Sequence, residues 1–333
     1  RVWHHLFGQG LVRSVDNFGV TGDVPSHPEL LDHLATWFVH NGWSTKKLVR
    51  KVVLSRAYRL DAEVSQANYA VDPANRLVWR HSPRRLDAEE IRDATLAAAG
   101  KLDLARPEAS PAKDMKVIEL SNDGPLARRL GEQASASTHR SLYLPLLRGL
   151  TPTSMEVFDF AEQGMVTGDR DTTTVATQAL YLLNDPFVRR QSLALAERLL
   201  EHTGTDKASR VDRAYQLTVG RPATAEEIKR AESYLSQYES AVREVLASTP
   251  AAAEPRPILV VALGGAGRNG RNASSPPAKA ALKKSAPPKN PDEVVPVEDP
   301  VKDEVIQPRD PKTAAWASFC QALLGTAEFR YIK

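Results

Sequence analysis

A charged block around residue 90 contains the side chains best suited to chemistry. It consists of Arg84, Arg85, Asp87, Glu89, Glu90, Arg92 and Asp93. Carboxylates held close to arginine can transfer protons or recognise a substrate carboxylate. The same residues also suit the start of a helix, because an acidic first turn complements the helix dipole and Glu89 can pair with Arg92. We favour the structural role, since structural ion-pair networks look identical in sequence.

An enzymatic alternative needs partners for this block from other segments. The candidate catalytic residues are Asp16, Arg85, Glu90 and Arg140, and Asn17, Asp159 and Asp171 are the further polar residues that could join them. This hypothesis requires the four candidates to meet in one concave pocket and to have perturbed pKa values. Side chains on separate surfaces would refute it.

Three other motifs have simpler interpretations. Gly265 to Gly270 satisfies G-x-G-x-x-G after an apolar run, but Pro276 and Pro277 follow where a dinucleotide site needs a helix, so we expect no nucleotide site. Five of the eight histidines lie in the first forty residues without metal-ligand spacing, so we expect no metal site. The run from Thr172 to Thr174 could hold an anion before a helix, although capping is its commoner use.

Composition excludes several classes of protein. Hydrophobic residues make up 42% and charged residues 26% of the 333 residues, close to globular averages. The 44 basic and 41 acidic side chains nearly cancel, so nothing indicates a nucleic-acid-binding protein. No apolar run is long enough to span a membrane. The single cysteine, Cys320, has helical spacing to Trp316, Phe319, Leu323 and Leu324 and is predicted to be a core residue.

Capping motifs and apolar periodicity predict the elements that position these side chains. Ser26 and Glu29 form a capping motif before a helix whose apolar face contains Leu30, Leu31, Leu34, Trp37 and Phe38. Ser44 begins a second helix, giving a helical hairpin. Asp87 and Glu90 cap a helix that runs to about Gly100. Residues 140–148 are the best candidate for a strand.

Helices return after residue 172. The first has an apolar face composed of Val175, Ala176, Ala179, Leu180 and Leu183. Two more follow, ending near His202 and at Gly220, and Thr224 with Glu227 caps another. That last helix carries a stripe that could pair with a partner helix, formed by Ile228, Ala231, Leu235, Tyr238, Val242 and Val245. The stripe is short for a coiled coil, so we favour packing within the chain.

The expected fold is therefore mainly α, a multi-helix orthogonal or bundle-like domain with at most a small β element. We expect a helical domain over residues 1–249, a disordered insertion rich in Pro, Ala and Lys over residues 250–311, and a terminal helix over residues 312–333 that docks back on the main domain. Because Arg1 already lies in a patterned stretch, we expect the sequence to be the C-terminal part of a longer protein.

Ordered blocks along most of the chain carry a family resemblance. They are residues 1–12, 16–19, 25–35, 42–58, 72–76, 84–93, 140–143, 172–186, 220–222, 320–324 and 328–331. In this order they resemble the planctomycete-specific C-terminal domain family, a domain of unknown function (number fifteen fifty-three, the planctomycete PSD domain). The insertion before the final helix departs from that pattern.

The resemblance implies a large exported protein in which a cytochrome c-like region precedes this domain. It implies an extracytoplasmic location, in the periplasm or at the cell surface, with haem c in upstream domains and no cofactor in this chain. The expected partners are upstream domains of the same polypeptide and a protein or polysaccharide, with no nucleic acid and no membrane span. The family supplies no catalytic residues.

Three functions remain open at this point. The first is a structural or interaction module beside the cytochrome c-like domain. The second is a hydrolase or oxidoreductase that acts on polysaccharide-derived substrates through the Asp/Glu/Arg cleft, so whether the chain is an enzyme stays undecided. The third, ranked last, is nucleic-acid binding by the Lys-rich insertion, which predicts salt-sensitive binding that disappears when residues 279–289 are deleted.

Overall fold

The computed structural model describes residues 1–109, 125–144, 146, 151–161, 164, 167–201, 206–248, 306 and 308–332. Across these residues the chain is mainly α-helical with one two-stranded sheet, as predicted. The predicted insertion at 250–311 lies outside the described residues apart from 306 and 308–311, and the glycine-rich motif at 265–270 lies outside them entirely.

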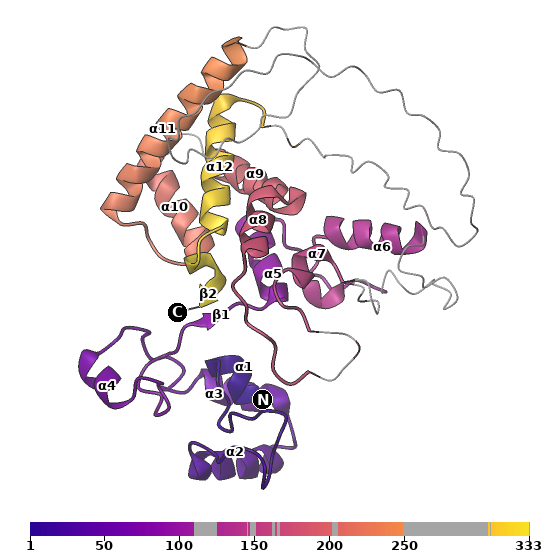
Figure 1. Ribbon diagram of the computed structural model, residues 1–333, viewed down its shortest axis with the longest axis vertical. Coiled ribbons are helices and arrows are strands. Elements are labelled where there is room, and N and C mark those ends of the chain that lie inside the picture. The colour runs from indigo at the N-terminus through magenta and orange to yellow at the C-terminus, as the bar shows by residue number, and fades with distance from the viewer. Residues whose placement is uncertain are drawn as a thin grey trace, which may run out of the picture.

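The main body contains the helices after residue 87. They are α5 (Ala88–Ala98), α6 (Pro125–Ala136), α7 (Thr153–Glu156), α8 (Ala176–Asn184), α9 (Pro186–Leu200), α10 (Lys207–Val219), α11 (Ala225–Ser248) and α12 (Pro311–Leu324). Helix α12 lies beside α9 and α11 (Figure 1). Trp316, Cys320 and Leu324 on α12 are almost fully buried, because a central helix is apolar on most sides.

The predicted packing of α11 within the chain is confirmed. Ala231, Leu235 and Val242 are buried, and α11 contacts α10 and α12. The predicted capping box at its start is also present, since the Glu227 backbone N–H donates to Thr224 Oγ1 and the Thr224 N–H donates to Glu227 Oε2.

The N-terminal part lies at the other end of the molecule (Figure 1). It contains α1 (Val2–Phe7), α2 (Pro28–His40), α3 (Thr45–Val53) and α4 (Gln66–Val71). Helices α2 and α3 contact each other, which confirms the predicted hairpin, and the Ser44 hydroxyl caps α3 by accepting from the Lys47 N–H. The predicted cap at Ser26 is wrong: its hydroxyl donates to the Leu11 carbonyl, and Pro28 begins α2 with His27 as N-cap.

A short antiparallel ladder joins the two parts of the chain. Strand β1 (Arg84–Arg85) pairs with β2 (Tyr331–Ile332), with Arg84 opposite Ile332. The predicted strand at residues 140–148 is wrong where it is described. Residues Ser141–Tyr143 form the 3-10 helix η2, while 145 and 147–150 lie outside the described residues. A second 3-10 helix, η3 (Glu328–Arg330), precedes β2.

Helix α8 shows the largest difference from expectation. The apolar face predicted from its sequence is exposed, whereas Gln178 and Leu182 are the buried residues. The Gln178 amide fits the interior because its Nε2 donates to the carbonyl oxygen of Thr173. Its Oε1 is buried without a hydrogen-bond partner among the described residues, so the amide is only partly satisfied, and apolar periodicity alone does not decide which side of α8 faces the body.

Candidate functional site

The charged block is positioned by β1 and by the start of α5. Arg84 and Arg85 form β1, and Asp87 is the N-cap of α5. The predicted capping box is present, because the Asp87 side chain accepts from the first turn while Glu90 accepts from the Asp87 backbone N–H at 2.8 Å. Burial raises the pKa of Asp87, and the neighbouring Glu90 charge adds to this rise.

Glu90 is held by Arg84 in a bidentate pair. Arg84 Nη1 and Nη2 each donate to a Glu90 oxygen at 2.8 Å. Burial acts to raise the pKa of Glu90, but the hydrogen bonds from Arg84 and from the Asp87 backbone outweigh it and leave that pKa lowered. Glu90 is therefore an ionised carboxylate, and both of its oxygens are already engaged.

Glu89 has an equivalent partner from a distant segment. Arg170 Nη1 and Nη2 donate to its two oxygens at 2.6 and 3.0 Å, and the Arg170 guanidinium lies 5.0 Å from the centroid of the Phe160 ring. The hydrogen bond to Glu89 raises the pKa of Arg170. This pair connects the loop before α8 to the first turn of α5.

Asp93 binds the segment that contains η2. Its Oδ1 accepts from both the backbone N–H and the hydroxyl of Ser141 at 2.7 Å, and its Oδ2 lies 3.7 Å from Arg140 Nε. Next to it, Arg92 is 2% exposed and donates to carbonyl oxygens between residues 134 and 139. These bonds close the segment 134–141 over α5.

A cavity of about 580 Å³ lies between these elements. Its polar lining comes from Glu89, Glu90, Asp93, Arg140 and Ser141, and its apolar lining from Leu86, Ala94, Ala97, Leu102, Leu142, Leu146, Phe160 and Ile332. The three carboxylates each already accept hydrogen bonds from within the chain. The cavity therefore has room for a ligand, and its three carboxylates are held in place by hydrogen bonds from within the chain.

The structure brings together two of the four candidate residues. Glu90 and Arg140 line the cavity, whereas Asp16 and Arg85 are not among its lining residues. Arg85 is buried, lies 3.3 Å from Asp159 Oδ2 and donates to the Thr173 carbonyl. The catalytic assignment of these residues stays a prediction.

Asp16 belongs to a different contact. It pairs with Arg1 and lies directly against Gly168, where a Cβ atom would collide with its carboxylate. Its neighbour Asn17 bonds to Thr21 within a local turn, and Asp171 is exposed.

Sequence reasoning did not identify Arg170 as a partner of the charged block, and it considered the histidines of α1 only as metal ligands. His4 Nε2 lies 3.3 Å from Asp169 Oδ1, and burial, followed by the charge of His4, lowers the pKa of His5. The charged run at residues 169–171 was the available signal. It carries no information on which distant carboxylate each side chain meets.

Groups that could bind a metal ion or act as a reactive thiol are few among the residues that the structure describes. No group of three or more His, Cys, Asp or Glu residues there is arranged to hold a metal ion. Cys320 is fully buried, as predicted, and burial raises the pKa of its thiol. Searched over the same residues, no helix is long and apolar enough to cross a membrane.

Comparison with known proteins gives one match. No curated protein and no solved structure matches the chain at a significant level. The match is to the family described as Protein of unknown function (DUF1553), named PSD1, and it covers residues 1–235, which includes β1, α5 and the segment around Arg140. The resembling blocks at residues 320–324 and 328–331 lie outside this match. Because the match spans well over half of the sequence, the chain belongs to the PSD1 family of proteins of unknown function.

Proposed function

We propose that this chain is a non-catalytic interaction module, which docks against a cytochrome c-like domain of the same exported multidomain protein. The observation that carries the proposal is the exposed apolar face of α8. Val175, Leu180 and Leu183 are 46%, 57% and 63% exposed, and Ala176 and Ala179 beside them are also exposed. Contiguous exposed apolar residues mark interaction sites on proteins.

Burial of this face would contribute favourably to docking. Burying a valine or leucine side chain fully contributes about 1.5–3 kcal/mol, so the three large side chains, already half-buried, would contribute a few kcal/mol. Leu182 on the opposite side of α8 packs into the core and fixes the orientation of the helix. The face is thus presented on a supported element rather than on a free loop.

The state of the cleft also supports a non-catalytic role. Glu89 and Glu90 are each locked by a bidentate arginine, and Asp93 by Ser141. A general base needs a free lone pair directed at its substrate. The charged block is better explained as a structural network of ion pairs and hydrogen bonds that holds β1, α5 and the 134–141 segment together.

The setting of the module rests on the family resemblance. In that setting the protein is extracytoplasmic, the neighbouring domain holds haem c, and this chain holds no cofactor. The α8 face would then orient the cytochrome c-like domain relative to the main body.

Association with the cytochrome c-like domain of its own polypeptide tests the proposal. The double variant Leu180→Glu/Leu183→Glu should weaken binding, measured by titration calorimetry, by about a hundredfold or more, because two buried contacts become buried charges. Leu54→Glu/Leu104→Glu is the matched control, since these leucines are 57% and 71% exposed on other segments. Equal affinities for the two variants, or no association of the native chain, would refute the docking role.

One observation favours the alternative of a hydrolase or oxidoreductase acting on polysaccharide-derived substrates. Glu90 and Arg140 do line a single cavity, together with Glu89 and Asp93. An enzyme should turn over such substrates, and Glu90→Gln should abolish turnover while circular dichroism shows a folded protein. Absence of turnover by the native chain across oligosaccharide substrates would remove this alternative.

A further inference from the structure

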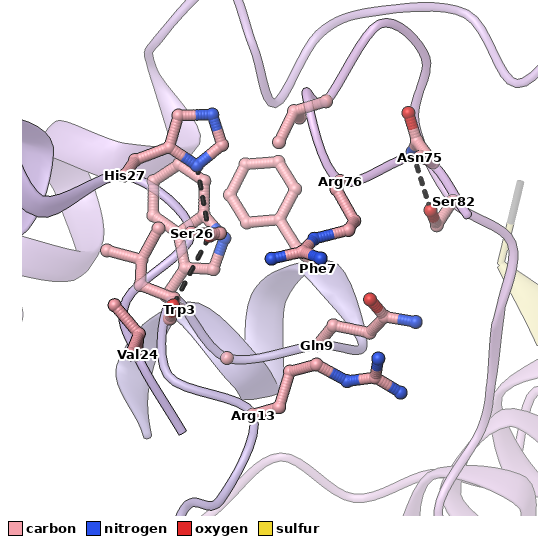
Figure 2. Close-up of a pocket in the computed structure, with 13 residues that line it drawn as sticks. Trp3, Phe7, Gln9, Arg13, Val24, Ser26, His27, Asn75, Arg76 and Ser82 are labelled. Atoms are coloured by element: carbon pink, nitrogen blue, oxygen red, sulfur yellow. Dashed lines mark hydrogen bonds between the residues drawn. The ribbon is translucent and has the colours of Figure 1, made fainter. Parts of the chain in front are cut away.

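A second pocket lies in the N-terminal part, far from the α5 cleft in sequence and formed by different residues. Figure 2 shows it between α1, the segment after α1 and the loop after α4. Its lining residues are Trp3, Phe7, Gln9, Gly10, Leu11, Arg13, Val24, Ser26, His27, Asn75, Arg76, Val78 and Ser82. No carboxylate is among them, so the charged groups of the lining are cationic.

The two arginines of this pocket differ from those of the α5 cleft. Arg84, Arg85 and Arg170 all pair with carboxylates of the chain. Arg13 and Arg76, by contrast, have no ion-pair or hydrogen-bond partner for their guanidinium groups among the residues that the structure describes. Both arginines are exposed and line the pocket, and Figure 2 shows the Gln9 side chain between their guanidinium groups. Two cationic groups at one pocket make the local potential positive.

The loop that carries Arg76 is held in place by its own hydrogen bonds. Asp72 accepts from the backbone N–H groups of Arg76 and Leu77 at 3.0 and 2.7 Å, so this nearby carboxylate is directed at the backbone. Asn75 Nδ2 donates to Arg80 O at 2.9 Å and to Ser82 Oγ at 2.7 Å. Arg76 is therefore presented from an ordered base, which lowers the entropy lost when a ligand binds.

Backbone strain occurs in the same loop. Val78, which lines the pocket, has a φ of 54°. A β-branched residue in this left-handed region is uncommon and strained. Such strain persists where the surrounding structure holds the residue in place, and it is concentrated at ligand sites.

The opposite wall of the pocket is aromatic. The Trp3 and Phe7 rings stack with centroids 4.1 Å apart, and Phe7 packs edge-on against Tyr58 at 5.6 Å. Phe7 is 5% exposed. An apolar wall lowers the local dielectric, which strengthens the attraction between a guanidinium group and an anion.

We propose that this pocket binds an oxyanion group, which Arg13 and Arg76 grip with their N–H forks beside the Trp3 and Phe7 wall. The guanidinium fork matches the oxygens of carboxylate, sulfate and phosphate groups. The pocket is small, with a cavity volume of about 40 Å³. It therefore admits the charged group, while the rest of the ligand lies outside. This site is independent of the docking role of α8.

Titration calorimetry of the native chain with sodium sulfate, sodium phosphate and sodium acetate tests the proposal, with ionic strength held constant by sodium chloride. Saturable one-to-one binding of at least one anion is expected. The tightest of the three identifies which group the ligand carries. Arg13→Gln/Arg76→Gln should weaken that binding by about a hundredfold, since each charge-assisted contact is worth about tenfold or more.

The matched control is Arg213→Gln/Arg230→Gln, which removes two exposed arginines from α10 and α11. It should leave the affinity within about twofold, because the remaining effect is screened long-range attraction. Backbone amide shifts of residues 9–13 and 75–78 on adding the anion give a second measurement that needs no variant. Equal loss in both double variants, unchanged shifts, or no saturable binding of any of the three anions would overturn the proposal.

Discussion

Replacing Arg92 by methionine should destabilise the protein more than any other single change in the charged block. The side chain is 2% exposed, and its guanidinium makes four hydrogen bonds. Nη1 donates to His139 O at 3.1 Å and to Ser141 Oγ at 3.3 Å, while Nη2 donates to Ala134 O at 3.3 Å and to Ser137 O at 2.5 Å. One side chain therefore donates to three backbone carbonyls and one hydroxyl of the segment 134–141.

The magnitude follows from the acceptors left behind. Methionine keeps the apolar stem but removes the Arg92 donors from three backbone carbonyls, each costing about 1–3 kcal/mol when buried. Part of this cost is relieved because water can reach the turn, so we expect a loss of about 3–5 kcal/mol, the range for breaking a buried charged network. Burial lowers the pKa of Arg92, yet a guanidinium stays protonated in proteins, so the loss should not vary between about pH 6 and 8.

Urea unfolding followed by circular dichroism measures the change in the free energy of unfolding. Arg243→Met is the control, because Arg243 is 68% exposed and pairs with Glu239 on the surface of α11, where such pairs contribute about 0.3–0.5 kcal/mol. Hydrogen exchange should accelerate in residues 131–144 of Arg92→Met. A loss of unfolding free energy below about 1 kcal/mol, or unchanged hydrogen exchange in that segment, would refute the assignment of Arg92 as the side chain that holds the segment against α5.

Three further outcomes can be checked separately. Hydrogen bonds from Arg221 lower the pKa of Glu227 from 4.5 to about 2, so its stabilising effect is complete above pH 4.5 and is lost as the pH falls towards 2. Glu227→Gln should therefore reduce the loss of unfolding free energy between these two pH values, and an unchanged loss would contradict this. Gly168→Ala should displace the Asp16 carboxylate at a cost within about 0.5 kcal/mol in thermal unfolding, because this side chain is half-exposed and can move aside, whereas a clearly lowered melting temperature would show that the carboxylate is held in place. Cys320 should resist a thiol reagent at about pH 8 in the folded protein and react in urea, because burial raises the pKa of its thiol; rapid reaction of the folded chain would argue against its burial.

Local capping chemistry was predictable because its partners are close in sequence. Asp87 with Glu90 and Thr224 with Glu227 each lie three residues apart, and both form the boxes that their spacing predicts. Ser26 shows the limit of this reasoning. Its hydroxyl donates to the Leu11 carbonyl, fifteen residues away, instead of accepting from the first turn of α2, which has His27 as its N-cap.

The geometry of the cleft was only partly predictable for the same reason. The enzymatic hypothesis required Asp16, Arg85, Glu90 and Arg140 to meet in one pocket, and only Glu90 and Arg140 line the cavity beside α5. The expected strand at residues 140–148 fails because Asp93, 48 residues earlier, binds the N–H and hydroxyl of Ser141 and bends the chain there. The partner of Glu89, Arg170, is 81 residues away and was not identified.

The two groups of arginines show what sequence cannot separate. Arg84 and Arg76 both follow a polar stretch in the first ninety residues, and each has an acidic residue within six positions. In the structure Glu90 turns back to Arg84, whereas Asp72 turns to the backbone N–H of Arg76, whose guanidinium has no partner among the described residues. The first arrangement uses its charge to hold the fold. The second leaves an exposed positive charge at a pocket, where it is free to meet a ligand, and this asymmetry is why we assign binding to the N-terminal pocket rather than to the larger cavity beside α5.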